Sequence, residues 1–182
     1  SYGKTLARPS FREISPISWY DFTTNYQFTG NPDLERTLIH NFDLRLEKYL
    51  PGAGLLSLSG FFKNFINPIE QVMNVEAQNV ELSWRNVKEA VLFGLEFEFK
   101  KKIVLNEGEY LNIGFNTSLI KSSTQIDKGE LELIRAFEPK HSDTRRMYGQ
   151  SPYIINAYSQ YQNNGWNIGA NFNVSGESIV IV

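Results

Sequence analysis

The sequence reads TLIHNFDLRLEKYL over residues 37–50, and this stretch decides the fold. Its even-numbered positions are apolar apart from His40 and Lys48, whereas positions 41 to 47 carry Asn, Asp, Arg and Glu at the odd numbers. A period of two matches the side chains on one face of a β-strand. We therefore predict a long strand with one apolar and one polar face.

The same alternation returns further along the chain. With a short opening strand, it predicts about seven strands, most of them longer than the usual five or six residues. The further stretches are Tyr2–Ala7, Leu56–Phe62, Val91–Phe99, Leu111–Leu119, Tyr153–Tyr161 and Trp166–Val174.

Short and long connections alternate between these strands. The short ones contain the glycines that tight hairpin turns need, at Pro51–Gly54, Leu105–Gly108 and Asn163–Gly165. The long ones are predicted as loops, with one or two helical turns or a strand extension at Glu130–Phe137; they span Pro9–Arg36, Asn67–Asn86 and Ser122–Ser151. All tight turns then lie at one end of the sheet and all long loops at the other, which is typical of outer-membrane barrels.

The alternate positions that carry polar side chains, which we call the polar parity, must contact water; the other positions form the apolar parity. An arginine such as Arg45 would cost about 2–4 kcal/mol if it faced lipid in the middle of a strand. We therefore predict a polar lumen wall that includes Asp43, Arg45, Glu96, Glu98, Asn112 and Asn116. Aromatic residues close to the tight turns predict an interfacial girdle, made of Tyr49, Tyr110, Tyr161 and Trp166.

Composition excludes several classes of function. The 182 residues contain 18 Lys and Arg against 20 Asp and Glu, so no basic surface for nucleic acid is expected. Cysteine is absent, which excludes disulfides and thiol chemistry. The longest apolar run, Ala90–Leu95, is far shorter than the roughly 20 residues of a membrane-spanning helix.

No catalytic motif is present, and we expect neither an enzyme nor a cofactor. Glu96 and Glu98 lie two positions apart on one strand face, about 6.6 Å along the chain, a spacing that a glycoside hydrolase could use. Two solvated carboxylates on a polar wall explain the pair more simply. His40 and His141 are the only histidines, and no metal site is expected from two such distant residues.

The long loops contain the residues most suited to binding. A surface with large aromatic side chains and arginines suits sugars, aromatic chelates or peptides about equally well. The same aromatics could instead pack on one another and close the loops into a cap. The candidate ligand-binding residues are Trp19, Tyr20, Tyr26, Trp84, Arg85 and Arg146.

Five short motifs occur in an order that resembles the barrel of TonB-dependent outer-membrane receptors. They are SYGKTLARPSFRE at residues 1–13, GNPDL at 30–34, NPIE at 67–70, GLEFE at 94–98 and QSPY at 150–153. Together they span nearly the whole chain.

The resemblance implies a barrel of about 22 strands with a plugged lumen. It implies a transporter in the cell outer membrane that imports iron chelates, cobalamin or glycans with energy from the TonB complex, and that contacts outer-membrane lipid. The family's plug, TonB box and closing strands have no counterpart here. We therefore expect residues 1–182 to be a partial β-barrel domain from the C-terminal half: an all-β, antiparallel up-and-down meander that is a fragment of a large transmembrane barrel.

A secreted soluble β-sandwich or lectin-like binding module is the alternative. Its strands would also alternate, but its apolar face would be covered by a second sheet. It predicts a monodisperse protein without detergent, whereas the barrel fragment predicts an exposed apolar face.

Overall fold

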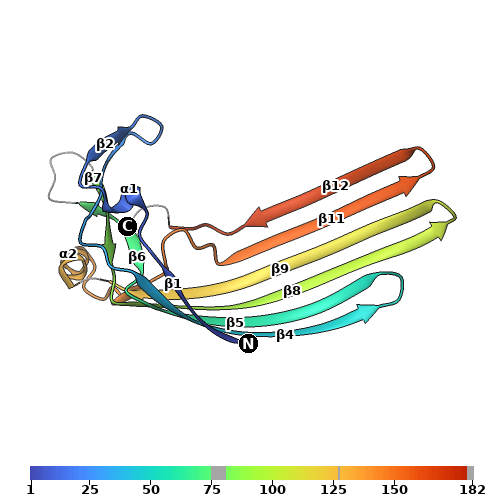
Figure 1. The fold of residues 1–182 in the computed structure, drawn as a ribbon, viewed down its shortest axis with the longest axis horizontal. Coiled ribbons are helices and arrows are strands. Elements are labelled where there is room, and N and C mark those ends of the chain that lie inside the picture. Colours follow the sequence, from blue (N-terminus) through green and yellow to red (C-terminus); the bar gives the residue numbers. More distant parts are fainter. Residues whose placement is uncertain (75–80, 127, 180–182) are drawn as a thin grey trace.

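The computed structural model describes residues 1–74, 81–126 and 128–179. Seven strands form the main sheet in the order β1-β4-β5-β8-β9-β11-β12, and the short β10 pairs with β9 (Figure 1). Every pair in this sheet is antiparallel. The strands are β1 (Tyr2–Ala7), β4 (Thr37–Leu50), β5 (Gly54–Ile66), β8 (Glu89–Asn106), β9 (Glu109–Gln125), β10 (Thr144–Arg145), β11 (Tyr153–Asn163) and β12 (Trp166–Ser175). The predicted up-and-down meander is confirmed.

Tight turns join β4 to β5, β8 to β9 and β11 to β12 at one end of the sheet (Figure 1). Gly52, Gly108 and Gly165 have φ angles of 72°, 76° and 132° in these turns. Residues that carry a side chain rarely adopt such φ angles, which explains glycine at these positions. The long connections lie at the opposite end, as predicted.

The long connections are more ordered than the sequence indicated. They contain α1 (Phe11–Ile14), β2 (Ser18–Asp21), β3 (Tyr26–Thr29), β6 (Ile69–Asn74), β7 (Glu81–Asn86) and α2 (Lys128–Phe137). A second sheet forms in the order β2-β3-β7-β6, in which β3 and β7 pair in parallel. For the first two connections the expectation of irregular loops was therefore wrong, because strands from two different loops complete each other's hydrogen bonds. In the third connection, α2 contains the stretch Glu130–Phe137 where helical turns or a strand extension were expected. We call this second sheet, with α1, α2 and β10, the cap.

The register of the main sheet separates its two faces, because directly paired residues point to the same side. The apolar face is open to its surroundings, and the exposed fractions of the paired residues named below range from 40% at Phe62 to 68% at Leu44. No second sheet covers this face within the described residues. The paired apolar residues include Phe42, Leu44, Leu46, Leu58, Phe62, Phe93, Leu95 and Leu119.

The polar parity forms the concave face of the curved sheet. Side chains on a concave face converge and shield one another, and here Ser57 and Ser59 are buried although they belong to the polar parity. Two aromatic rings lie flat over glycines on this face. A Cβ added at Gly94 would come within 2.2 Å of the Phe61 ring, and one at Gly114 within 2.1 Å of Tyr158.

The predicted aromatic girdle is only half right. Tyr161 and Trp166 share the apolar face, where Tyr161 pairs with Leu111 and Ile168. Tyr49 and Tyr110 instead lie on the polar parity. The Tyr49 hydroxyl donates to Glu47 at 3.0 Å. Closeness to a turn does not determine the face of a side chain, whereas its parity does.

Buried apolar side chains gather at the loop end. Leu82 of β7 and Ala90 of β8 are each 1% exposed, and Val87 and Ile126 are also buried. The core that the structure describes therefore lies between the cap and the end of the main sheet. No helix among the described residues is long and apolar enough to span a bilayer.

Candidate functional site

Aromatic side chains from two different loops stack within the cap. The ring centroid of Trp19 on β2 lies 5.5 Å from that of Phe28 on β3 and 5.7 Å from that of Trp84 on β7. The guanidinium of Arg12 lies 5.4 Å from the Trp19 ring centroid, which is within cation–π range. Two predicted ligand-binding residues, Trp19 and Trp84, are therefore neighbours, but part of their ring surface packs against other rings.

The parallel pairing of β3 with β7 produces this stack. Phe28 pairs with Leu82, so Trp84 follows two residues later on the same strand face. Asn31 adds a second link, because its Nδ2 donates to the carbonyl of Trp84 at 3.0 Å. The first and second loops thus form one unit.

The β2–β3 hairpin exposes a second aromatic group. The Tyr20 and Phe22 rings meet edge to face at 5.1 Å, and Phe22 is 88% exposed. Tyr26 is half-buried and pairs with Asp21 at the base of the hairpin. The backbone N–H of Thr23 donates to Asp21 at 2.9 Å and lowers the pKa of that carboxyl. Sequence reasoning did not select Phe22, although it lies beside Tyr20 in the same aromatic-rich loop.

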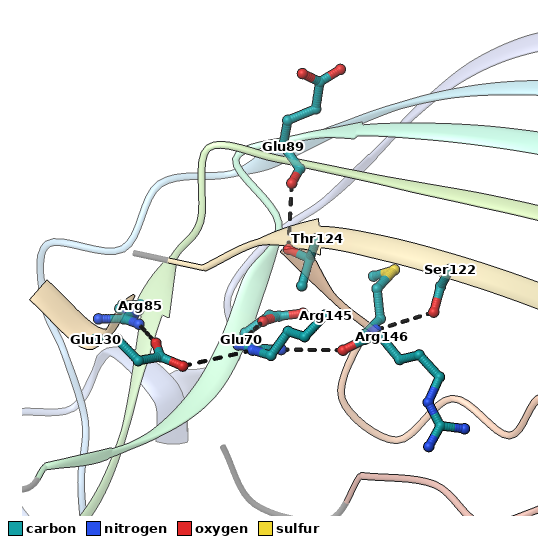
Figure 2. Close-up of polar contacts among 9 residues, drawn as sticks. Glu70, Arg85, Glu89, Ser122, Thr124, Glu130, Arg145 and Arg146 are labelled. Atoms are coloured by element: carbon teal, nitrogen blue, oxygen red, sulfur yellow. Dashed lines mark hydrogen bonds and ion pairs between the residues drawn. The ribbon is translucent and has the colours of Figure 1, made fainter. Parts of the chain in front are cut away.

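Charged residues join the second loop to the third (Figure 2). Arg145 of β10 donates to Glu70 of β6 at 2.7 Å, with side chains only 11% and 3% exposed. The Nε of Arg145 lies 3.8 Å from Glu130 of α2, and Glu130 also pairs with Arg85 of β7. We call these four residues the charge network.

The two arginines predicted to bind ligand, Arg85 and Arg146, therefore have different surroundings. Arg85 is bound into the charge network. Arg146 is exposed, and its Nη1 donates to the carbonyl of Glu177 at 3.4 Å. The role of Glu70 was missed, because nothing in the local sequence shows that this carboxylate is buried against an arginine 75 positions away.

Backbone contacts fix the third loop onto the main sheet near the charge network. The Met147 N–H donates to Ser122 at 3.0 Å, and Thr124 donates to the Glu89 carbonyl at 3.3 Å (Figure 2). Ser122 and Thr124 are both buried. The Met147 contact and the pairing of Arg145 with Thr124 position Arg145 beside Glu70, whereas the Thr124 hydroxyl joins β9 to β8.

All six residues predicted for the lumen wall lie on the concave polar face. Their register places Arg45 beside Ser59, Ser59 beside Glu96, Glu98 beside Asn116, and Asn112 beside Lys102. Asp43 lies on the same face of β4, two residues before Arg45. The sequence pattern therefore identified which residues share this surface.

The polar side chains of this face bind one another across the strands. Arg45 pairs with Glu98 at 2.9 Å, and Glu98 also pairs with Lys100. Asn156 donates to Asn116 at 2.7 Å, and Asn173 donates to Asn156. These contacts form two groups, one between β4 and β8 and one from β9 to β12, and the register pairing of Glu98 with Asn116 lies between them.

The geometry gives no support to a glycoside hydrolase. Glu98 lies between Arg45 and Lys100, whereas Glu96 accepts a hydrogen bond from Ser118 at 3.5 Å. A carboxylate held by two cations is poorly placed to serve as a proton donor. In the described ranges, no three His, Asp or Glu side chains are grouped to hold a metal ion.

Comparison with known families identifies the fold. A family described as TonB dependent receptor-like, beta-barrel, matches residues 1–180. The chain belongs to this family. TonB-dependent receptors are outer-membrane proteins, so a secreted soluble sandwich was the wrong alternative.

A solved structure agrees with this assignment to the TonB-dependent receptors. The siderophore receptor PirA from Pseudomonas aeruginosa is similar, with a TM-score of 0.52 and 16% sequence identity. The match covers 93% of this chain and 31% of PirA, so the chain spans about a third of that receptor. No curated protein matches the sequence.

Proposed function

We propose that the chain contributes part of the barrel of an importer that captures a scarce nutrient at the cell surface. The TonB complex would supply energy through a plug inside the barrel, and the apolar face would contact outer-membrane lipid. The main sheet, with seven strands in its path, would form about a third of a barrel of some 22 strands. The family and the fold of PirA support this proposal.

One observation carries the proposal: the cap joins an aromatic-rich loop to Trp84 of a second loop, at the end of the sheet that carries the polar wall (Figure 1). Trp19 and Trp84 come from different loops, yet they lie in one stack with Arg12 beside them. Such a surface can bind a ligand and pass it to a water-filled path along Arg45, Glu98 and Asn116. An isolated structural cap would not need a polar wall below it.

The ligand would be a small molecule with planar or sugar-like faces, such as a metal chelate or a glycan. We keep Trp19, Tyr20, Tyr26, Trp84, Arg85 and Arg146 as the candidate contacts. In this arrangement the exposed hairpin of Tyr20 and Phe22 would touch the ligand first, and the stack below would hold the hairpin in place.

Uptake by whole cells tests the proposal. Cells that produce the full-length receptor would be offered panels of ferric chelates and of oligosaccharides, and uptake would be measured with and without TonB. Changing Trp19 and Trp84 together to Ala should reduce capture at least tenfold, because an aromatic contact contributes about 0.5–1.5 kcal/mol beyond its buried area.

Trp166→Ala is the matched control, because Trp166 is an exposed aromatic residue at the tight-turn end. Antibody labelling of intact cells would show that each variant reaches the surface. Equal uptake by the double variant and the control would exclude the stack from ligand capture, and uptake without TonB would refute energised import.

A further inference from the structure

The lipid-facing surface of the main sheet contains a groove near the tight turn between β4 and β5. Its volume is about 300 Å³, and the outward-facing residues that line it are Leu46, Lys48, Leu56, Leu58 and Phe97; Glu47 and Ser57, which belong to the opposite face, complete the lining. Register places the outward-facing residues side by side, with Leu46 beside Leu58, Leu58 beside Phe97, and Lys48 beside Leu56. The outward-facing lining is therefore apolar except for one lysine at its end.

Lys48 has no carboxylate to neutralise it. The neighbouring Glu47 lies on the opposite face, where it pairs with Arg45. Lys48 is exposed, and it forms no ion pair or hydrogen bond among the residues that the structure describes. A lysine on a lipid-facing surface extends its stem along apolar side chains toward the interface.

A second cation lies nearby on the outward parity. Lys100 and Lys102 point to the polar face, where they contact Glu98 and the Tyr110 ring. Lys101, between them, points outward, and its Nζ donates to the carbonyl of Pro51 in the β4–β5 turn. The outward positions of β4, β5 and β8 in this half of the strands carry no carboxylate.

We propose that this groove binds a glycerophospholipid with an anionic headgroup. An acyl chain would lie along Leu46, Leu58 and Phe97, and the phosphate of the headgroup would meet Lys48 and Lys101. The two halves of the site match the two halves of such a lipid in polarity and charge. Tight turns of outer-membrane barrels face the periplasm, so the site lies in the phospholipid leaflet.

Lipid retention by the full-length receptor tests the proposal. The receptor would be reconstituted in vesicles of phosphatidylglycerol and phosphatidylcholine, extracted in mild detergent and analysed by native mass spectrometry. Lys48→Gln with Lys101→Gln should lower the retained phosphatidylglycerol at least fivefold, relative to phosphatidylcholine, because each lysine near an anionic surface favours binding by about that factor.

Lys121→Gln is the matched control. Lys121 is also exposed and outward, but it pairs with Phe93 at the loop end of the sheet. It should leave phosphatidylglycerol retention unchanged. Equal retention by the double variant and the wild type, or an equal loss in the control, would overturn the proposal.

Leu58→Trp tests the groove without changing its charge. Filling the groove should reduce retention of both lipids, and unchanged retention would refute an acyl-chain site. The mobility of unheated samples in gel electrophoresis would show whether each barrel is folded. If Leu58→Trp does not fold, the lysine variants still decide the outcome.

Discussion

Glu70 and Arg145 place opposite charges together inside the loop end. Nearly complete burial removes both groups from water, and their ion pair at 2.7 Å only partly replaces that hydration. The Oε1 atom of Glu70 has no hydrogen-bond partner among the described residues. Removing one partner of such a pair leaves an uncompensated charge, whereas removing both does not.

Arg145→Met should therefore destabilise the cap by about 3–5 kcal/mol. Hydrogen exchange of the β6 and β7 amides in the full-length receptor would measure the effect as lost protection. The control is Arg146→Met, because Arg146 is adjacent and exposed, and its side chain makes one long hydrogen bond among the described residues. Changing Glu70 and Arg145 together to Met should restore most of the protection. A double variant as unprotected as the single one would contradict this explanation.

At the scale of the strands, glycine and an aromatic residue on the next strand act as a pair. Phe61 of β5 lies directly over Gly94 of β8, and Tyr158 of β11 lies over Gly114 of β9. Each ring covers backbone that the glycine leaves bare and lies along the wall instead of extending into the lumen. The pairs thus keep a polar wall open although it contains large aromatic residues.

Gly94→Ala should destabilise the barrel by about 1–3 kcal/mol, because the new Cβ would overlap the Phe61 ring. The temperature at which the folded band disappears in gel electrophoresis would measure the loss. Gly60→Ala is the control, since its Cβ would lie 3.4 Å from Leu95, close to an ordinary contact. Phe61→Leu should rescue Gly94→Ala, and no rescue would mean that the ring is not the cause.

At the scale of the whole molecule, the proposed barrel wall would separate two solvents, lipid outside and water within. Leu46 faces outward at 62% exposure, whereas Asn112 faces the concave side. An arginine among lipid tails costs about 2–4 kcal/mol, while one on a wet wall costs little. The two faces should therefore respond differently to the same substitution.

Leu46→Arg should make folding into phosphatidylcholine vesicles less favourable by about 2–4 kcal/mol, as measured by urea titration of the full-length receptor. Asn112→Arg should change it by less than about 1 kcal/mol. Similar losses for both variants would show that the outward face does not meet lipid.

The alternation of side chains was sufficient to predict the seven strands along the path of the main sheet and their two faces, and glycine indicated the tight turns. These properties depend on neighbours in the sequence. The six residues predicted for the lumen wall share one face for this reason, and their place in a lumen wall stays a prediction. Candidate site residues were harder to predict. Trp19 and Trp84 were selected for their chemistry, and packing of the loop aromatics on one another was the open alternative, but nothing local indicated that these two rings would meet.

By itself, then, the sequence determined a two-faced antiparallel meander with glycine turns at one end, through a period of two that each strand carries independently. Only the tertiary structure decided the cap. The parallel pairing of β3 with β7 and the burial of Glu70 against Arg145 join segments that are far apart in the chain. Such contacts form because backbone groups and charges removed from water must find partners, and which partners they find depends on the arrangement of all three loops at once.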